Sequence, residues 1–230
     1  MKIFLINEAL PDTVEIYLCR FGKTVRLQRS GFIPLPVGAH PDTLIGKLGK
    51  NLFVSESETE IMSALDKNGI PYITSSHLPG GKYPADCALN FIAVKDILCA
   101  KLTAISKDVL RYAEADGYKM LNVAQGYTKC STLVLGGGII TADGGIHSTM
   151  VSSGLASLKI EAGHVSLPPY EYGFIGGASG TVGENAVFFG SLEDHPNKDE
   201  IRSFCKKLGY SPVEFDFELT DFGGFIEVDI

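Results

Sequence analysis

One unit of about 46 residues recurs five times along this chain of 230 residues, and this repeat limits the possible folds more than any other feature. Each unit starts with a short apolar strand that is followed by a small residue or a turn. These strands begin at positions 3, 52, 97, 139 and 187, so that successive units lie 42 to 49 residues apart. A fixed period of this length is typical of repeat architectures such as propellers and solenoids. The sequence therefore predicts five similar units.

A helix that stops at a glycine follows each of these strands. The expected helices cover residues 12–21, 57–68, 106–116, 146–153 and 197–208, and a glycine follows each one directly. Glycine there adopts the left-handed conformation that ends a helix. Ser57 and Glu60 match a capping box, and Asn197 is the expected N-cap of the last helix. A strand follows each glycine, over residues 23–28, 70–75, 119–124, 155–160 and 213–217.

A further strand precedes each hairpin turn. We expect these strands over residues 43–48, 88–94, 132–135, 181–184 and 225–230. Gly136–Gly138 has the composition of the turn in one hairpin. No helix follows the strand at residues 225–230, so we expect it to pair with Lys2–Ile6 and to close a ring. Each unit then has the order strand, strand, helix, strand.

The fold class expected from this pattern is α/β, with five ββαβ units around a pseudo-fivefold axis in one domain of residues 1–230. This arrangement resembles the pentein fold, the α/β-propeller of guanidino-group-modifying enzymes, over essentially the whole chain. The phrases QGYTKCST (125–132) and GFIGGASG (173–180) resemble those of an uncharacterised bacterial branch of that superfamily. The alternative is two α/β domains that divide near Pro79-Gly80-Gly81. The repeat runs through that boundary without a break, which favours the ring.

Composition excludes several classes of function. The net charge is −7 and the longest basic run is Lys206-Lys207, whereas nucleic-acid binders need clustered Lys and Arg. No run of about 18 apolar residues is present, and the first seven residues are too short an apolar stretch for a signal peptide. We therefore expect a cytoplasmic protein that binds neither nucleic acid nor membrane. Its acidic balance suits a cationic small molecule or solubility.

Five cysteines are scattered along the chain without a C-x-x-C pair, which argues against zinc and thioredoxin-type sites. An odd, dispersed set fits a reducing compartment. We expect no metal and no cofactor. Cys19, Cys99 and Cys205 lie among apolar residues and are expected in the core. Cys87 and Cys130 lie in polar loops, where a functional thiol remains open.

In a ring of this kind the loops that enter the hairpins converge at one end of the axis. Aligning the units on their apolar strands predicts one slot in each unit, occupied by Asp42, Cys87, Cys130, Ser179 and Asp221. The neighbours of these slots are polar as well: His40, Asp86, Gln125, Lys129 and Ser131. The mouth of the axis is therefore expected to gather carboxylates, thiols and a histidine.

The resemblance implies a cysteine thiolate that attacks the guanidinium carbon, a histidine that transfers protons and carboxylates that hold the cation. In pentein enzymes that cysteine stands near the C-terminus, shortly after a Gly-Gly pair. Here Gly223-Gly224 is followed by Phe225, Ile226 and Glu227, so the position carries no cysteine. The usual nucleophile is absent from its place.

Cys130 is the candidate substitute, because pseudo-symmetry makes the slots geometrically similar. Lys129 is expected to lower the pKa of its thiol, and Ser131 to donate a hydrogen bond to it. His40 is the candidate base, and Asp86 is placed with them in the catalytic set. The expected substrate-binding residues are Asp42, Cys87, Gln125, Lys129, Ser131, Ser179 and Asp221. The opposing interpretation is that Cys130 is a buried packing residue.

Residues 173–183 are glycine-rich but fit neither the dinucleotide nor the P-loop spacing. They predict either a nest of backbone N–H groups for an anion or, preferably, a close chain crossing near the axis. Two functions remain open. One is a cysteine-dependent hydrolase or deiminase acting on a small guanidino or amidine compound. The other is a non-catalytic module that binds a macromolecule, as a five-unit ring does in the factor that keeps ribosomal subunits apart.

Overall fold

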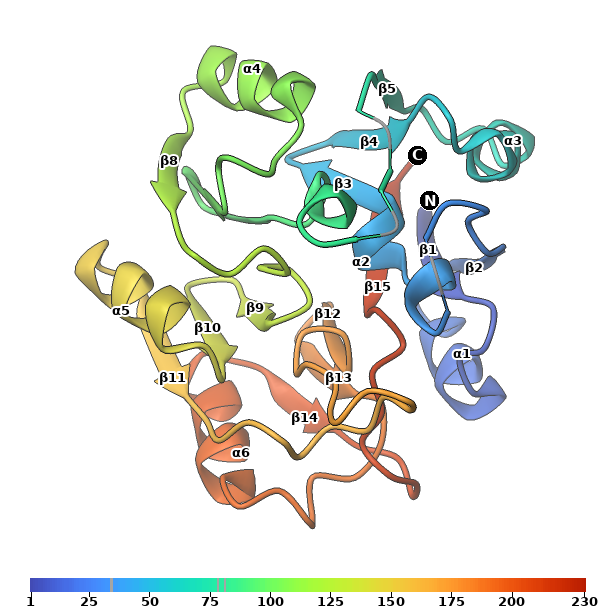
Figure 1. The fold of residues 1–230 in the computed structure, drawn as a ribbon. Coiled ribbons are helices and arrows are strands. Elements are labelled where there is room, and N and C mark those ends of the chain that lie inside the picture. Colours follow the sequence, from blue (N-terminus) through green and yellow to red (C-terminus); the bar gives the residue numbers. More distant parts are fainter. Residues whose placement is uncertain (34, 78, 81) are drawn as a thin grey trace.

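Five three-stranded sheets follow one another around a central axis in the computed structural model, which describes residues 1–33, 35–77, 79–80 and 82–230 (Figure 1). In each sheet the middle strand pairs antiparallel with the strand nearer the axis and parallel with the outer strand, as in β15-β1-β2. The predicted ββαβ repeat is confirmed by this topology. Gly81, at the alternative domain boundary, lies outside the described residues.

The elements follow the five units in order. The first unit contains β15 (Phe225–Asp229), β1 (Lys2–Asn7), α1 (Asp12–Leu18) and β2 (Lys23–Leu27). The second contains the 3-10 turn η1 (Val37–Ala39), α2 (Pro41–Leu44), β3 (Ile45–Leu48), β4 (Asn51–Ser55), α3 (Thr59–Lys67) and β5 (Ile73–Ser75). The third contains η2 (Ala85–Cys87), β6 (Ile92–Val94), β7 (Ile97–Ala100), α4 (Lys107–Ala115) and β8 (Lys119–Asn122). The fourth contains β9 (Thr132–Leu135), β10 (Gly138–Thr141), α5 (Gly144–Ser152) and β11 (Ala156–Lys159). The fifth contains β12 (Ser179–Val182), β13 (Asn185–Phe188), α6 (Lys198–Lys207) and β14 (Ser211–Val213).

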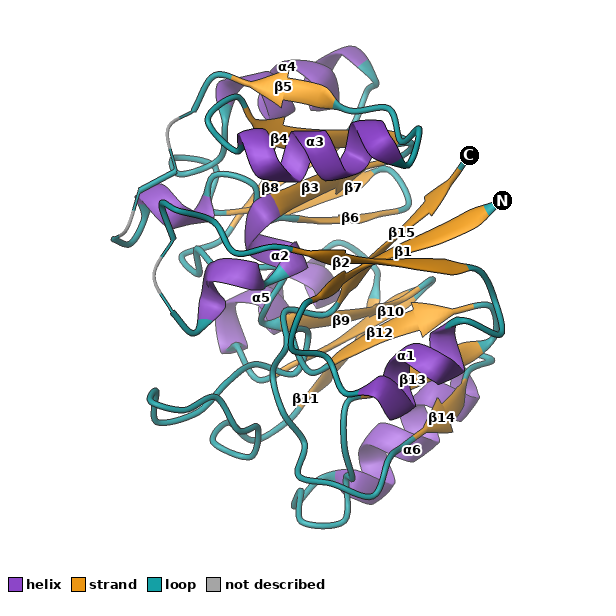
Figure 2. Ribbon diagram, turned by 90° about the vertical axis from the view of Figure 1, so that its right-hand side faces the viewer, coloured by secondary structure: helices purple, strands orange, loops and turns teal. Residues whose placement is uncertain are grey.

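The two ends of the chain close the ring, as predicted. Strand β15 pairs antiparallel with β1 from Lys2 opposite Asp229 to Ile6 opposite Phe225. The helices α1, α3, α4, α5 and α6 lie on the outside of the ring, whereas α2 lies near its centre (Figure 1). Seen from the side, the termini lie at one end of the strands and the long connecting loops at the other (Figure 2).

The apolar core is divided among the spaces between neighbouring units. One cluster joins Ile3 and Leu5 of β1 to Leu52 and Val54 of β4. The other four clusters bridge adjacent units in the same way. Because every cluster takes side chains from two units, a single unit cannot bury its own apolar surface.

The helix-stop glycines are confirmed in four units and differ in the first. The positive φ angles of four of them end their helices in the left-handed conformation: Gly69, Gly117, Gly154 and Gly209. Gly22 has no such φ angle. A Cβ atom there would collide with the backbone oxygen and side chain of Lys2, so close approach of two chain segments explains this glycine.

Several predicted boundaries shift for physical reasons. Helix α3 begins at Thr59, and its N-cap Glu58 makes no side-chain capping bond, so the expected capping box at Ser57 and Glu60 is wrong. The Asn197 side chain accepts a hydrogen bond from the Glu161 N–H (2.8 Å) instead of capping α6. Residues 41–44 form α2 rather than the start of a strand.

The last predicted outer strand is also shorter than expected. Strand β14 covers Ser211–Val213, whereas the strand was expected over residues 213–217. Phe215 and Phe217 stack on one another at 6.0 Å between ring centroids, and Phe215 meets the Tyr17 ring edge-on. These aromatic side chains cover α1, so that burial between units overrides continued pairing in the sheet.

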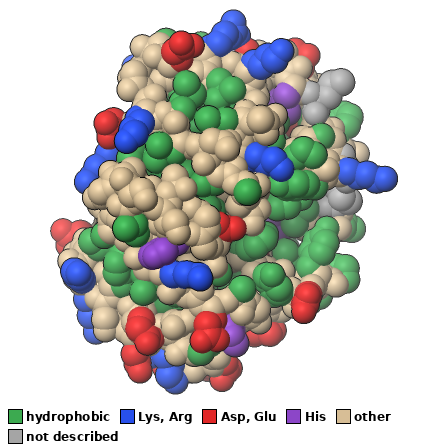
Figure 3. Space-filling view, turned by 60° about the vertical axis from the view of Figure 1, so that its left-hand side comes forward, with side chains coloured by type: hydrophobic (Ala, Val, Ile, Leu, Met, Phe, Trp, Pro, Cys, Tyr) green, Lys and Arg blue, Asp and Glu red, His purple; other side chains and the backbone are tan. Residues whose placement is uncertain are grey.

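No helix in the described part of the chain is long and apolar enough to cross a membrane. On the face shown in Figure 3, acidic and basic side chains are interspersed and no basic patch gathers.

Candidate functional site

A closed circuit of hydrogen bonds links all five units around the axis. Four links are N–H to O bonds of 2.7–3.3 Å: Asp42 to Gly223 O, Gly224 to Gly177 O, Gly177 to Cys130 O, and Cys130 to Asn90 Oδ1. The fifth is donated by the Asn90 side-chain amide to Asp42 O at 2.9 Å. Only this unit uses a side chain in the circuit. The circuit fixes the residues at the mouth of the axis relative to one another.

The strand register shows which residues occupy equivalent positions. Two residues before the first hairpin pair of each unit stand Thr43, Asn90, Cys130, Gly177 and Gly223. The predicted alignment was therefore correct for Cys130 and one residue out at Asp42. It was wrong at Cys87 and Ser179, because the 3-10 turn η2 and the glycine-rich segment change the distance between loop and strand, and Asp221 lies two residues before the equivalent Gly223.

Glycines at the mouth allow the chains to approach closely. A Cβ atom on Gly177 would overlap the Asp221 carboxylate, and one on Gly176 would overlap the backbone oxygens of Lys129 and Cys130. Gly223 has a φ of +77° and lies directly against His40. The preferred interpretation of residues 173–183, a close chain crossing, is confirmed.

A pocket of about 340 Å³ opens at this end of the axis, and Cys130, His40 and Asp221 all line it. Its remaining walls are apolar and aromatic, with one further carboxylate: Val37, Thr43, Tyr127, Leu167, Tyr170, Glu171, Tyr172 and Phe174. The structure thus brings together the predicted nucleophile, the predicted base and one predicted carboxylate.

The Cys130 thiol lies in a buried, acidic environment. Only 4% of the residue is exposed. Burial raises the pKa of this thiol well above its ordinary value, and the charges of Asp42 and Asp221 raise it further. The expectation that Lys129 lowers this pKa is wrong. The counteracting group is the Asn90 amide, which donates a hydrogen bond to Cys130 Sγ at 3.0 Å.

Asp42 lies beside this thiol with no solvent exposure. Neither carboxylate oxygen finds a hydrogen-bond partner among the described residues, and its contact with the thiol does not reach hydrogen-bond geometry. A buried, unpartnered carboxylate is costly to the folded state. Asp42 therefore lies behind the thiol, next to Cys130 but outside the lining of the pocket.

Asp221 has a different environment, because its carboxylate already accepts two backbone N–H groups. Its Oδ1 accepts from Gly223 and its Oδ2 from Phe174, both at 2.9 Å. The Nδ1 atom of His40 lies 3.6 Å from Oδ1. Burial raises the pKa of Asp221, and the charge of His40 opposes that rise. Asp221 thus orients His40 and anchors the loop that precedes β12.

Asp86 acts on the pocket through an aromatic wall. Its Oδ2 accepts a hydrogen bond from the Tyr127 hydroxyl at 2.5 Å, and Asp86 does not itself line the pocket. The Tyr127 ring stands 6.2 Å from that of Phe174, centroid to centroid. Burial and the Asp86 carboxylate raise the pKa of Tyr127, which keeps the hydroxyl a donor. Asp86 therefore positions a wall of the pocket.

Lys129 does not line the Cys130 pocket. It lines a second pocket, of about 190 Å³, together with Lys47 and Glu227. The Lys47 ammonium donates to the backbone oxygen of Glu227, and Lys2 pairs with the Glu227 carboxylate at 2.7 Å. The C-terminal position at which the resemblance places a nucleophile thus belongs to a basic, distant end of the ring.

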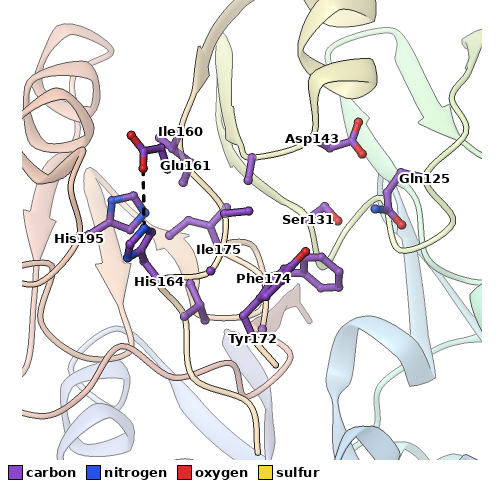
Figure 4. Close-up of a pocket in the computed structure, with 15 residues that line it drawn as sticks. Gln125, Ser131, Asp143, Ile160, Glu161, His164, Tyr172, Phe174, Ile175 and His195 are labelled. Carbon is purple, nitrogen blue, oxygen red and sulfur yellow. Dashed lines mark ion pairs between the residues drawn. The ribbon is translucent and has the colours of Figure 1, made fainter. Parts of the chain in front are cut away.

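Gln125 and Ser131 line a third pocket of about 130 Å³, next to the Cys130 pocket (Figure 4). Tyr172 and Phe174 line both pockets and separate them. The Ser131 hydroxyl is buried without a partner among the described residues and does not donate to Cys130. The expected Ser131 bond is therefore absent.

The remaining predicted residues lie in structural positions. The Ser179 hydroxyl donates to the Ile175 backbone oxygen at 2.5 Å. The Cys87 thiol is buried 3.5 Å from Asp86 Oδ1, and burial raises its pKa. Within residues 1–33, 35–77, 79–80 and 82–230, no three His, Cys, Asp or Glu side chains are placed to hold a metal ion.

Asn90 is the residue that the sequence pattern does not reveal. It contacts Asp42, Lys129 and Cys130 through one fully buried amide. An asparagine two residues before a short strand is an ordinary turn residue in sequence. Correct alignment of the five strands would have placed it in the same slot as Cys130.

Comparison with known families identifies the chain's relatives. Residues 5–226 match the family described as "Family of unknown function (DUF6873)". The chain belongs to this family. No curated protein has a matching sequence.

Solved structures with similar folds include a dimethylarginine dimethylaminohydrolase and an amidinotransferase. An adduct of dimethylarginine dimethylaminohydrolase with S-methyl-L-thiocitrulline has a TM-score of 0.57 at 13% identity, covering 94% of this chain and 92% of that one. DDAH from Pseudomonas aeruginosa, complexed with citrulline, has a TM-score of 0.58 at 11% identity, with 100% and 98% covered. An amidinotransferase from Microseira wollei in the saxitoxin biosynthetic pathway has a TM-score of 0.57 at 10% identity, with 92% and 76% covered. The chain therefore has the pentein fold.

Proposed function

We propose that this protein is a cysteine-dependent hydrolase that cleaves a C–N bond of a small guanidino or amidine compound, with Cys130 as nucleophile. One observation carries the proposal. The unpartnered carboxylate of Asp42 lies beside a buried thiol that faces a pocket also lined by His40 and Asp221. A planar amidinium ion in this pocket complements the Asp221 carboxylate that lines it, has the Asp42 carboxylate behind the thiol, and brings its electrophilic carbon to the sulfur.

The cation itself activates the nucleophile. In the free protein the raised pKa keeps the Cys130 thiol neutral. A positive charge beside the sulfur offsets the fields of Asp42 and Asp221 and favours the thiolate, which is the reactive form. The Asn90 N–H stabilises that thiolate by a charge-assisted hydrogen bond.

The first chemical step forms a C–S bond between Cys130 and the guanidinium carbon. The thiol proton passes through His40 to one amino group of the substrate, whose C–N bond breaks to release ammonia. A cationic thiouronium adduct remains on the sulfur. In the second step water adds to its carbon and gives a proton to His40. The C–S bond then breaks, Cys130 regains a proton, and the products are a ureido compound and one further proton, which ammonia takes up.

The test uses 2-chloroacetamidine and its neutral isostere 2-chloroacetamide. We expect one adduct at Cys130 by intact mass and peptide mapping, formed faster with the amidine, and lost in Cys130→Ser. Ammonia release from guanidino compounds is expected to disappear in the same variant. Absence of the amidine adduct, or ammonia release that persists in Cys130→Ser, contradicts the proposal.

A second candidate function is a non-catalytic module that binds a macromolecular partner. The observation in its favour is that Glu227, not cysteine, occupies the C-terminal position of the usual nucleophile. Such a module predicts a stoichiometric partner in pull-downs at near-physiological salt and no ammonia release. An open pocket that Cys130, His40 and Asp221 line together favours the enzyme.

A further inference from the structure

The Cys130 pocket has two acidic residues in its lining, Asp221 and Glu171. Asp221 lines the deep end beside His40, and Glu171 lines the outer part. None of the described residues that line this pocket is Lys or Arg. A ligand with a carboxylate would therefore lack a cationic side chain to pair with, and would face two carboxylates of like charge.

The outer part of the pocket has the chemistry of a cation site. Tyr170 and Tyr172, which flank Glu171 in the chain, are 50% and 38% exposed, and both line the pocket. The Glu171 carboxylate makes no ion pair with any described residue. The ring of Tyr172 meets that of Phe174 edge-on at 6.4 Å, so the aromatic wall continues inward. Aromatic faces beside a carboxylate attract an ammonium group.

A basic side chain that lines a neighbouring pocket already has an ion-pair partner. Arg29 lines this pocket, which shares His40 and Asp221 with the Cys130 pocket. Its guanidinium forms an ion pair with Glu8. Arg29 is therefore a candidate partner for a ligand carboxylate, and its role can be tested separately.

We propose that the ligand of this pocket is a dication without a carboxylate: a guanidine or amidine joined by an alkyl chain to a second ammonium group. Its guanidinium lies at Cys130, and its ammonium lies between Tyr170, Glu171 and Tyr172. The alkyl chain packs against Leu167 and Phe174, which line the middle of the pocket. This inference rests on the proposed function and narrows its substrate class.

The size of the pocket agrees with such a ligand. At roughly 30 Å³ for each water molecule, about 340 Å³ holds the equivalent of about eleven waters. An aminoalkyl guanidine with a four-carbon chain fits within that volume. A simple amidinium would fill only the deep end and leave Glu171 without a partner.

The experiment compares three probes that share one guanidinium. Agmatine carries the second ammonium, arginine adds a carboxylate to it, and butylguanidine lacks the ammonium. Their affinities are measured by calorimetry on the full chain with Cys130→Ser, which prevents turnover, and ammonia release is measured on the wild type. We expect agmatine to bind at least about tenfold more tightly than either other probe.

Two variants test whether Glu171 binds the ammonium group of the ligand. Glu171→Gln is expected to reduce the preference for agmatine over butylguanidine, and the effect should weaken at high salt. Glu114→Gln, a change of an exposed carboxylate on α4, is the matched control and should keep the full preference. A preference that survives Glu171→Gln intact overturns the placement of the ammonium.

The outcomes separate this inference from the function on which it rests. Arginine binding as tightly as agmatine overturns the inference and leaves the hydrolase proposal standing. Loss of that arginine affinity in Arg29→Gln would then show that Arg29 holds the carboxylate. Failure of all three probes to bind overturns both proposals.

Discussion

The two ends of the ring axis differ in charge although the same five hairpins build both. At the loop end, Asp42 and Asp221 surround the Cys130 thiol. At the opposite end, Lys47 and Lys129 lie around strand β15. Cys130 and Lys129 are adjacent in sequence, yet the turn before β9 sends their side chains to different pockets. The pseudo-symmetry therefore places residues near the axis, and the local turn geometry determines which pocket each side chain lines.

The largest expected difference between the ends is in catalysis. Cys130→Ser removes the nucleophile and should abolish ammonia release from a guanidino substrate. Lys129→Met changes a side chain at the other end and should leave that activity close to wild type. Steady-state rates with the same substrate measure both. An inactive Lys129→Met protein that keeps its fold would contradict the conclusion that Lys129 lies outside the catalytic site.

His40→Asn should slow turnover by about 10²–10⁴-fold, the usual contribution of a general acid-base group. The matched change His164→Asn alters a histidine that lines other pockets but not the Cys130 pocket, and should have little effect. Single-turnover release of ammonia separates chemistry from product release. Equal losses in both variants would remove His40 from the reaction.

Asn90→Ala tests the circuit that holds the acidic end together. It leaves the buried N–H groups of Lys129 and Cys130 without Asn90 Oδ1, so we expect a loss of roughly 2–4 kcal/mol of unfolding free energy. Asn68→Ala, at the C-cap of α3, removes an exposed contact with Lys23 and should cost much less. Urea unfolding measures both. We further propose that residues 1–230 unfold in one cooperative transition, because each apolar cluster joins two units.

Acidic residues at the two ends should affect stability in opposite directions. Asp42→Asn removes a buried, unpartnered charge and should raise the unfolding free energy by about 1–3 kcal/mol while it abolishes ligand binding. Glu227→Gln removes the ion pair with Lys2 and should lower stability by about 0.2–1 kcal/mol. A destabilised Asp42→Asn protein would mean that Asp42 has a stabilising partner in solution.

Another expected difference between the ends is in the pH dependence of stability. Burial raises the pKa of Asp221 to about 6, so the folded state keeps a proton that the unfolded chain loses near pH 3.9. Stability therefore falls as the pH rises from about 3.9 to about 6. Burial lowers the pKa of Lys47, so stability rises with pH in the window below about 10.4. Each slope is limited to about 1.4 kcal/mol per pH unit. Differences between wild type and Asp221→Asn or Lys47→Met should show opposite signs, and equal signs would refute this assignment.

The fold was largely predictable because its signals are local and repeated. Apolar strands and helix-stop glycines such as Gly69 and Gly117 each report backbone conformation within a few residues. Five copies of a weak signal make a strong one. The errors arise where contacts between units take over, as at Phe215 and Phe217, whose packing on α1 ends the sheet early.

The sequence predicted several residues of the site, but not the directions in which their side chains point. Cys130, His40 and Asp221 were expected at one mouth, and all three line one pocket. The directions of Lys129 and Ser131 depend on the turn before β9, which no local pattern specifies. Asn90 was missed because its importance lies in bonds to residues about 40 positions away.

The ionisation of Cys130 tests the central claim most directly. Thiolate absorbance is followed against pH as the difference between wild type and Cys130→Ala, with and without acetamidine, by rapid mixing so that binding is observed before the C–S bond forms. We predict no Cys130 thiolate at the ordinary cysteine pKa of about 8.5 in the free protein, and its appearance when acetamidine binds. A thiolate already present at that pH without the cation, or a titration that acetamidine does not shift, would contradict the assignment of this pocket as a cation-activated thiol site.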